Sequence, residues 1–211
     1  IKQIMKLAQL FSDFEEELIR QGEEAESLSF VYRSVKNLSF TDFVFALQQE
    51  VTEKERQFVK EIFQQLAAHK PAQYIIGYAD FYGMKLKVDE RVLIPRPETE
   101  ELVELILAEN HEENLKVLDI GTGSGAIALA LAKKRPDWSV TAADISQDAL
   151  DLANENAKNQ NLQIFLKKSD CFTEISEKYD IIVSNPPYIS REDESEVGLN
   201  VLHSEPHLAL F

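Results

Sequence analysis

From residue 115 onward, short apolar segments alternate with helical segments, and this alternation restricts the possible folds more than any other feature. Strands joined by helices run parallel, because each helix carries the chain back to the end from which the next strand starts. The pattern therefore predicts an α/β fold with a doubly wound, mainly parallel sheet. The expected segments are strand 116–120, helix 126–134, strand 138–143, helix 146–158, strand 163–167 and strand 180–184.

Residues 1–70 show helical periodicity and no convincing strand. Apolar residues recur at three- and four-residue spacing, as at Leu7, Leu10 and Phe11, which is typical of an amphipathic helix. Thr41 and Thr52 are suited to cap two of the expected helices. A bundle this small needs bulky side chains to close. We therefore expect its aromatic residues to form the core: Phe11, Phe14, Phe30, Phe43 and Phe45.

The segment that follows the bundle has a different character. Prolines bracket it, and the runs 73–77 and 81–88 contain residues that favour a β-hairpin. Thr99 is then the expected N-cap of a helix. The predicted organisation is a helical domain at 1–70, a hairpin linker at 71–97 and a third domain at 98–211.

The charge balance argues against general binding to nucleic acid. The chain has 22 basic and 37 acidic side chains and a formal net charge of −15, whereas holding a phosphate backbone requires Lys and Arg patches. Cys171 is the single cysteine, so no internal disulfide can form and a reducing, cytoplasmic setting is expected. No apolar run reaches the roughly 18 residues that span a bilayer, so no membrane association is expected. The histidines show no ligand spacing with Cys171, so no metal site is expected.

The last expected strand ends abruptly at Asn185-Pro186-Pro187-Tyr188. Its run Ile181-Ile182-Val183 is typical of a strand covered on both faces, and the prolines that follow cannot continue a ladder. The Asn185 side chain and the Pro186 carbonyl are then held at the carboxyl end of a strand, where open α/β sheets bind ligands. They offer two acceptors for a planar –NH2 group, and Tyr188 offers a flat face. Taken alone, the motif can also be a plain strand-ending turn.

A glycine-rich turn lies directly between the strand that carries Asp119 and the following helix. Its residues are Gly121, Thr122, Gly123, Ser124 and Gly125. Glycines let the backbone approach a ligand closely, and the helix N-terminus can hold a pyrophosphate or a carboxylate. The spacing Gly-x-Gly-x-Gly differs from the Gly-x-Gly-x-x-Gly of dinucleotide-binding folds.

Two further acidic residues follow the next two expected strands. Asp144 can accept both hydroxyls of a ribose and would repel a 2′-phosphate. Asp170 can accept from the exocyclic amine of adenine, while Cys171 and Phe172 border the ring. Each acid alone is better explained as a helix cap or a solvated charge. All three strand ends together predict an adenosine pocket, although a nicotinamide cofactor stays open from these residues alone.

The chain resembles the class I methyltransferases that use S-adenosylmethionine. Within them it is similar to the protein-(glutamine-N5) methyltransferases that modify peptide chain release factors. The resemblance covers nearly all of the chain and rests on segments 71–77, 94–100, 119–125, 185–188 and 205–210. The Asn-Pro-Pro-Tyr motif is shared with DNA adenine and some rRNA base N-methyltransferases, so it specifies only an amide or aryl amine acceptor. The Pro-Arg-Pro-Glu-Thr-Glu segment and the helical N-terminal domain are the specific features.

The resemblance implies a Rossmann-like methyltransferase sheet, S-adenosylmethionine as cofactor and S-adenosylhomocysteine as product. It implies that the three glycines of the turn approach the methionine moiety, that Asp144 binds the ribose and that Cys171 lies beside the adenine. The full expected cofactor-binding set is Asp119, Gly121, Thr122, Gly123, Ser124, Gly125, Asp144, Asp170, Cys171, Phe172 and Asn185.

For the second substrate, the resemblance implies a glutamine of a peptide chain release factor and no direct contact with nucleic acid. Asn185 and the Pro186 carbonyl would hold the glutamine –NH2 group, with Pro187 beside them and Tyr188 packed on the amide plane. Catalysis would then consist mostly of orientation and electrostatic fit. The helical domain at 1–70 is expected to contribute to substrate recognition, because it precedes the active-site linker.

Two other functions stay open from the sequence. One is a DNA or rRNA base amino-N-methyltransferase, which the shared motif supports and the net charge of −15 opposes. The other is a non-catalytic binding module that keeps the same fold. Members of this fold continue for several strands beyond the Asn-Pro-Pro-Tyr strand, so the last strands are expected to be missing from this sequence. Met5 is a candidate for the native start, with residues 1–4 preceding it.

Overall fold

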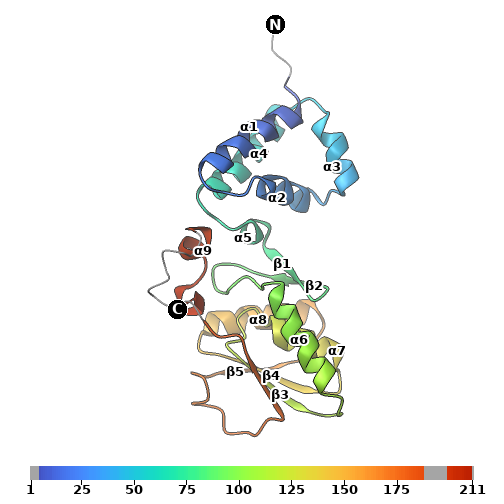
Figure 1. Ribbon diagram of the computed structural model, residues 1–211, viewed down its shortest axis with the longest axis vertical. Helices are drawn as coiled ribbons and strands as arrows, with labels where there is room; N and C mark the ends of the chain where they lie inside the picture. The colour runs from blue at the N-terminus through green and yellow to red at the C-terminus, as the bar shows by residue number, and fades with distance from the viewer. Residues whose placement is uncertain (1–4, 188–198, 211) are drawn as a thin grey trace. The chain divides into compact units, whose positions relative to one another are not determined.

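The computed structural model describes residues 5–187 and 199–210 (Figure 1). The chain divides into two compact units, of which the first comprises Ile1–Ile76 and Gly198–Ser204. The second comprises Gly77–Val197 and Glu205–Phe211. Within the described residues, no helix has the length and apolar character needed to cross a membrane. The prediction for Tyr188 lies outside the described residues.

The first unit is built from helices, as its periodicity predicts. They are α1 (Leu7–Arg20), α2 (Glu26–Lys36), α3 (Phe40–Leu47), α4 (Glu53–Ala67), α5 (Ala72–Ile76) and α9 (Leu199–Ser204) (Figure 1). The buried faces of α1 to α4 share one hydrophobic core. Phe11 and Phe43 are buried in this core as expected. The same expectation is wrong for Phe30 and Phe45, which are 38% and 66% exposed, because each lies on the outer face of its helix.

Side-chain caps fix the starts of α3 and α4. The predicted Thr41 cap is wrong, because Ser39 and Asp42 form a reciprocal capping box that starts α3 earlier. The Ser39 hydroxyl accepts from the Asp42 N–H at 3.1 Å, and the Asp42 carboxylate accepts from the Ser39 N–H at 3.3 Å. Thr52 caps α4 as predicted, and its hydroxyl accepts from the Glu55 N–H at 3.1 Å.

The predicted hairpin exists, but its strands are displaced. β1 (Tyr78–Phe81) pairs antiparallel with β2 (Met84–Lys87) across a two-residue turn. Both turn residues, Tyr82 and Gly83, have positive φ, as a tight hairpin requires. The strand predicted at 73–77 is wrong, because these residues belong mainly to helix α5. Pro71 precedes that helix and accepts from the Tyr74 N–H at 3.0 Å, and proline favours the first turn of a helix.

The second unit contains a four-stranded parallel sheet with the order β5-β4-β3-β6. The chain runs outward from β3 through β4 to β5 and then crosses to the other side of β3 to form β6. This order confirms the Rossmann-like fold prediction. The strands are β3 (Lys116–Ile120), β4 (Ser139–Asp144), β5 (Phe165–Lys168) and β6 (Ile181–Ser184), and the helices are α6 (Glu98–Glu109), α7 (Ala126–Lys134), α8 (Gln147–Asn159) and α10 (His207–Leu210).

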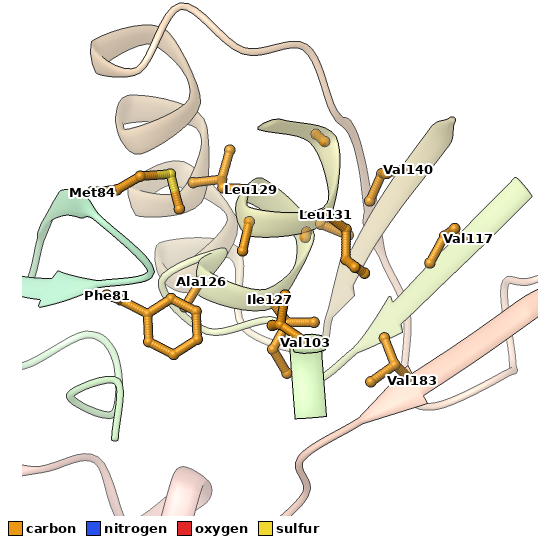
Figure 2. Packing of buried hydrophobic residues seen from close by; sticks show 14 of the residues in the cluster. Phe81, Met84, Val103, Val117, Ala126, Ile127, Leu129, Leu131, Val140 and Val183 are labelled. Atoms are coloured by element: carbon orange, nitrogen blue, oxygen red, sulfur yellow. The ribbon is translucent and has the colours of Figure 1, made fainter. Parts of the chain in front are cut away.

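One face of the sheet packs against the helices α6, α7 and α8. Val117, Val140 and Val183 come from three adjacent strands and lie on the side of α7 (Figure 2). Leu131 of α7 and Val103 of α6 belong to the same cluster (Figure 2). Because alternate residues of a strand share a face, this packing fixes the register that brings the strand ends together.

The other face is less covered in the described residues. Val183 is buried, but Ile182 is 54% exposed and Phe165 is 65% exposed. The prediction that β6 is covered on both faces is therefore wrong for this part of the chain. The apolar run alone could not show this, because a strand buried on one face can carry apolar residues on both.

Gly125 is the glycine of the turn that we expect to tolerate substitution least. Its φ is +82°, and an added Cβ would lie 3.2 Å from the Ala153 Cβ and 3.3 Å from the Leu129 Cδ1. We expect Gly125→Ala to lower the free energy of unfolding by about 2–4 kcal/mol, from backbone strain and overpacking together. Urea denaturation measures this loss.

Gly22→Ala is the matched control, because Gly22 has φ +84° and open space where its Cβ would lie. Only the backbone strain of about 1–2 kcal/mol is expected there. Equal losses in the two variants would show that the contact between α7 and α8 is not tight at Gly125.

Candidate functional site

The carboxyl ends of the four parallel strands lie along one edge of the sheet. The strand order reverses between β3 and β6, and open α/β sheets bind ligands in the crevice outside such a switch point. The residues that follow the strands at this edge are Gly121, Ile145, Ser169 and Asn185.

The glycine-rich turn after β3 is held by backbone hydrogen bonds. The N–H groups of Gly121 and Thr122 both donate to the Ala143 carbonyl, at 2.9 and 3.0 Å. Gly121 has φ +71° and Gly123 has φ +54°, and no heavy atom beyond their chain neighbours lies within 4 Å of the position of an added Cβ. A ligand can therefore approach the backbone closely at these two residues.

Asp144 ends β4, and two backbone N–H groups orient its carboxylate. Its Oδ2 accepts from the Gly123 N–H at 2.9 Å, and its Oδ1 accepts from the Ser146 N–H at 2.9 Å. Each carboxylate oxygen has two lone pairs, so both oxygens can still accept from a ligand. The arrangement suits two neighbouring hydroxyl groups.

Asp119 lies in β3 beneath the turn and is 1% exposed. Its Oδ2 accepts from the Thr122 hydroxyl at 2.6 Å. Its Oδ1 has no partner with hydrogen-bond geometry among the described residues. Burial raises the pKa of Asp119 to about 6, the nearby Asp144 carboxylate adds to the increase, and the Thr122 hydroxyl and Ala128 N–H offset part of it.

This pKa predicts a pH-dependent loss of stability. The pKa of Asp119 is about 6 in the folded state and about 3.9 when unfolded. The folded protein therefore binds this proton more tightly, and stability falls as pH rises from about 4 to about 6. The loss can reach about 3 kcal/mol.

Asp119→Asn removes the titration while keeping an oxygen that can accept from Thr122. The difference in free energy of unfolding, variant minus wild type, should therefore rise across that pH range, as measured by urea denaturation at several pH values. Taking this difference cancels the contributions of other carboxylates. A difference that stays constant with pH would show that Asp119 does not titrate there.

A cavity of about 240 Å³ lies at the strand ends, and we call it the donor cavity. It brings together many of the predicted site residues: Gly121, Gly123, Asp144, Asp170, Cys171, Asn185, Pro186 and Pro187. Sequence reasoning missed the rest of its lining. The missed residues are Arg91, Val92, Leu93, Ile120, Ile145, Ser146, Ala149, Ser169, Ser184, Pro206, Leu208 and Ala209.

Other predicted residues lie outside the donor cavity. Thr122 and Ser124 line a smaller neighbouring cavity of about 60 Å³. Phe172 is 55% exposed. Asp119 and Gly125 line neither cavity and support the turn from beneath. Contacts between these residues and a cofactor stay predictions.

Glu205 joins two distant walls of the donor cavity, and its carboxylate is 1% exposed. Its Oε2 accepts from the Ile94 N–H at 3.0 Å, and its Oε1 pairs with the Arg96 guanidinium at 2.5 Å. Residues 91–93 precede these partners, and Pro206 follows Glu205; all of them line the cavity. Segments 94–100 and 205–210 are both part of the family resemblance. Nothing in the sequence indicates that these two segments contact each other.

Asn185 lies where the two cavities meet, since it lines both of them. Its Nδ2 donates to the Thr99 hydroxyl at 3.2 Å. The prediction of Thr99 as a helix cap is wrong, because α6 begins at Glu98 and Thr99 is already its second residue.

No group of three or more His, Cys, Asp or Glu side chains in the described part of the chain is placed to hold a metal ion.

Comparisons with known proteins show the family of this chain. A family model described as the methyltransferase small domain matches residues 99–208, and one described as the PrmC N-terminal domain matches residues 9–77. A release factor glutamine methyltransferase of Streptococcus pneumoniae is 91% identical over 208 residues, which cover 98% of this chain and 75% of that protein. The chain belongs to the release factor glutamine methyltransferase family.

More distant relatives carry the same name. The release factor glutamine methyltransferase of Lactococcus lactis is 49% identical over 90% of this chain and 70% of its own length. Among solved structures, a ribosomal protein L11 methylase of Lactobacillus delbrueckii matches with a TM-score of 0.39 at 35% identity, over 43% of this chain and 47% of that one. Membership of the family identifies the protein as a methyltransferase, and S-adenosylmethionine is the methyl donor of this class.

The residues at the donor cavity fit that cofactor. The Asp144 carboxylate suits ribose hydroxyls, and Gly121 and Gly123 leave space beside the backbone. Ile145 and Leu208 supply apolar lining for a base. Cys171 also lines the cavity, where the sequence predicts the adenine.

Proposed function

We propose that this protein transfers a methyl group from S-adenosylmethionine to the side-chain amide nitrogen of a glutamine in a peptide chain release factor. The supporting observation is the position of Asn185, which lines both cavities at the end of β6. The names of its relatives indicate a release-factor glutamine as the methyl acceptor. The net charge of −15 favours a protein over a nucleic acid as substrate.

On this proposal, the cofactor lies with its ribose at Asp144, its methionine part along Gly121 and Gly123, and its adenine near Asp170 and Cys171. When bound, S-adenosylmethionine supplies an electrophilic methyl group on a sulfonium. The chain contributes position: the strand ends fix the donor at one side of Asn185 and leave the acceptor to approach from the other.

The acceptor nitrogen is a poor nucleophile, because its lone pair is delocalised into the amide carbonyl. The Asn185 side-chain oxygen and the Pro186 carbonyl can accept the two hydrogens of its –NH2 group. Both acceptors increase the electron density on nitrogen and favour a pyramidal geometry as it attacks. No side chain is needed to remove a proton beforehand, since the nitrogen becomes acidic once methylated. Pro187 and Tyr188 would complete the contact with the amide plane.

We assign recognition of the release factor partly to the helical unit. Its helix α3 exposes two large aromatic side chains, Phe40 at 65% and Phe45 at 66%. Aromatic side chains are enriched at protein-binding surfaces. A substrate that works in translation supports a cytoplasmic location for the protein.

A methyl-transfer assay tests the proposal. The complete protein is incubated with labelled S-adenosylmethionine and either a release factor, the same factor with its acceptor glutamine changed to alanine, or single-stranded DNA and RNA. We expect label only in the unchanged release factor, and mass spectrometry of its peptides should place the methyl group on one glutamine. Label in the nucleic acids and none in the release factor would overturn the proposal.

A further inference from the structure

We propose that Thr99 is a positioning residue that holds the Asn185 side-chain amide at the acceptor site. This inference rests on the proposed function for its catalytic consequence, but the contact itself is independent of it. The contact is the 3.2 Å hydrogen bond from the Asn185 Nδ2 to the Thr99 hydroxyl. Thr99 belongs to α6 and Asn185 follows β6, so two separate elements of the same unit meet here.

The orientation matters because the two ends of an asparagine amide are nearly equal in shape and opposite in chemistry. The oxygen accepts hydrogen bonds, and the nitrogen only donates them. The Thr99 hydroxyl can donate as well as accept, so the contact fixes where the amide lies. In the arrangement that the structure shows, the nitrogen is the end held at Thr99, and the oxygen is the end left for the acceptor. If the amide were reversed, an –NH2 group would face the –NH2 group of the acceptor, and neither could accept from the other.

The surroundings of Thr99 place its contact with Asn185 on the side of the small cavity, away from the proposed cofactor position. Thr99 lines the small cavity but not the donor cavity, whereas Asn185 lines both. The two cavities also share Leu93, Gly121 and Gly123. A change at Thr99 therefore reaches the acceptor geometry through Asn185 and leaves the lining of the donor cavity in place.

The test compares Thr99→Val, which has nearly the same shape but no hydroxyl, with Thr99→Ser, which keeps the hydroxyl. We expect Thr99→Val to lower kcat for release-factor methylation about tenfold, the factor that corresponds to one typical hydrogen bond. Its Kd for S-adenosylmethionine should stay within about twofold of wild type, because Thr99 does not line the donor cavity. Thr99→Ser should keep kcat within about threefold of wild type.

Thr41→Val is the matched control for the helix itself. Thr41 is the second residue of α3, as Thr99 is of α6, and it is exposed. Both substitutions place a β-branched apolar residue at the same helical position. If Thr41→Val lowered kcat as much as Thr99→Val, the effect would come from the substitution type, and the proposal would be wrong.

A second measurement does not depend on activity. Asparagine-selective 15N labelling of the complete protein gives side-chain amide signals, and the Asn185 signal is identified by its loss in Asn185→Asp. We expect this signal to shift or broaden in Thr99→Val and to stay in place in Thr99→Ser. An Asn185 signal that is unchanged in Thr99→Val but shifts when S-adenosylhomocysteine is added would mean that the nitrogen faces the donor cavity, which overturns the proposal. If wild type transfers no methyl group to a release factor, the proposed function fails, while the NMR comparison still decides the role of Thr99.

Discussion

Asn185→Ala should abolish most methyl transfer while leaving cofactor binding nearly intact. The substitution removes the side-chain acceptor of the substrate –NH2 group and leaves only the Pro186 carbonyl. Loss of one such preorganised group typically lowers kcat by about 100- to 1,000-fold. The donor cavity keeps its other lining residues, so the Kd for S-adenosylmethionine should change by no more than about threefold. Calorimetry gives the Kd, and single-turnover transfer to a release factor gives the rate.

The control for this variant is Asn159→Ala, in which an exposed asparagine at the end of α8 is truncated. Its rate and affinity should equal those of wild type. The two-site interpretation would be contradicted if Asn185→Ala lost cofactor binding to the same extent as transfer, because Asn185 would then act mainly on the donor.

Asp144→Ala should show the opposite result, with loss of cofactor affinity as the primary effect. A carboxylate that accepts from two hydroxyls makes two charge-assisted hydrogen bonds, each of about 1.5–3 kcal/mol. We therefore expect the Kd for S-adenosylmethionine to rise at least about 100-fold. Asp144→Asn keeps one acceptor oxygen and should fall between this variant and wild type.

A complication is that Asp144 also accepts from the N–H groups of Gly123 and Ser146. Its removal could loosen the turn, so the melting temperature of each variant must be measured beside its Kd. Asp148→Ala is the matched control, since it removes the same charge from an exposed position in the first turn of α8. A Kd for Asp144→Ala within threefold of wild type would exclude the ribose assignment.

The parts of the candidate site that the sequence indicates depend on local signals. The strand, glycine turn and helix around Gly121 follow each other directly in the sequence, so hydrophobic pattern and turn chemistry were enough to place them. Asp144 and Asn185 are predicted because a polar residue stands where an apolar strand stops. In each case the residue and its signal lie within a few positions of each other.

The parts that were missed depend on contacts between distant segments. Thr99 was interpreted as a helix cap, because a threonine before an apolar run normally acts as one, and its partner Asn185 is far away in the chain. The apolar run in β6 could not show that Ile182 is exposed, since exposure depends on what packs above the strand. The strand predicted at 73–77 became helix α5 because Pro71 supplies a helix start that outweighs β propensity.

The hydrogen bond of the Glu205 carboxylate bears on when, during synthesis, the protein becomes able to bind its cofactor. Its bond to Ile94 joins residues 111 positions apart, so it forms only after the whole sheet-forming segment between them has left the ribosome. Contacts of such long sequence separation form late, because their loop-closure entropy is offset only when neighbouring contacts already exist. A nascent chain that ends just after β6 already contains Asp144 and Asn185. The wall of the donor cavity formed by residues 91–93 and Pro206 is still incomplete at that stage. High-affinity cofactor binding should therefore begin only after Glu205 emerges.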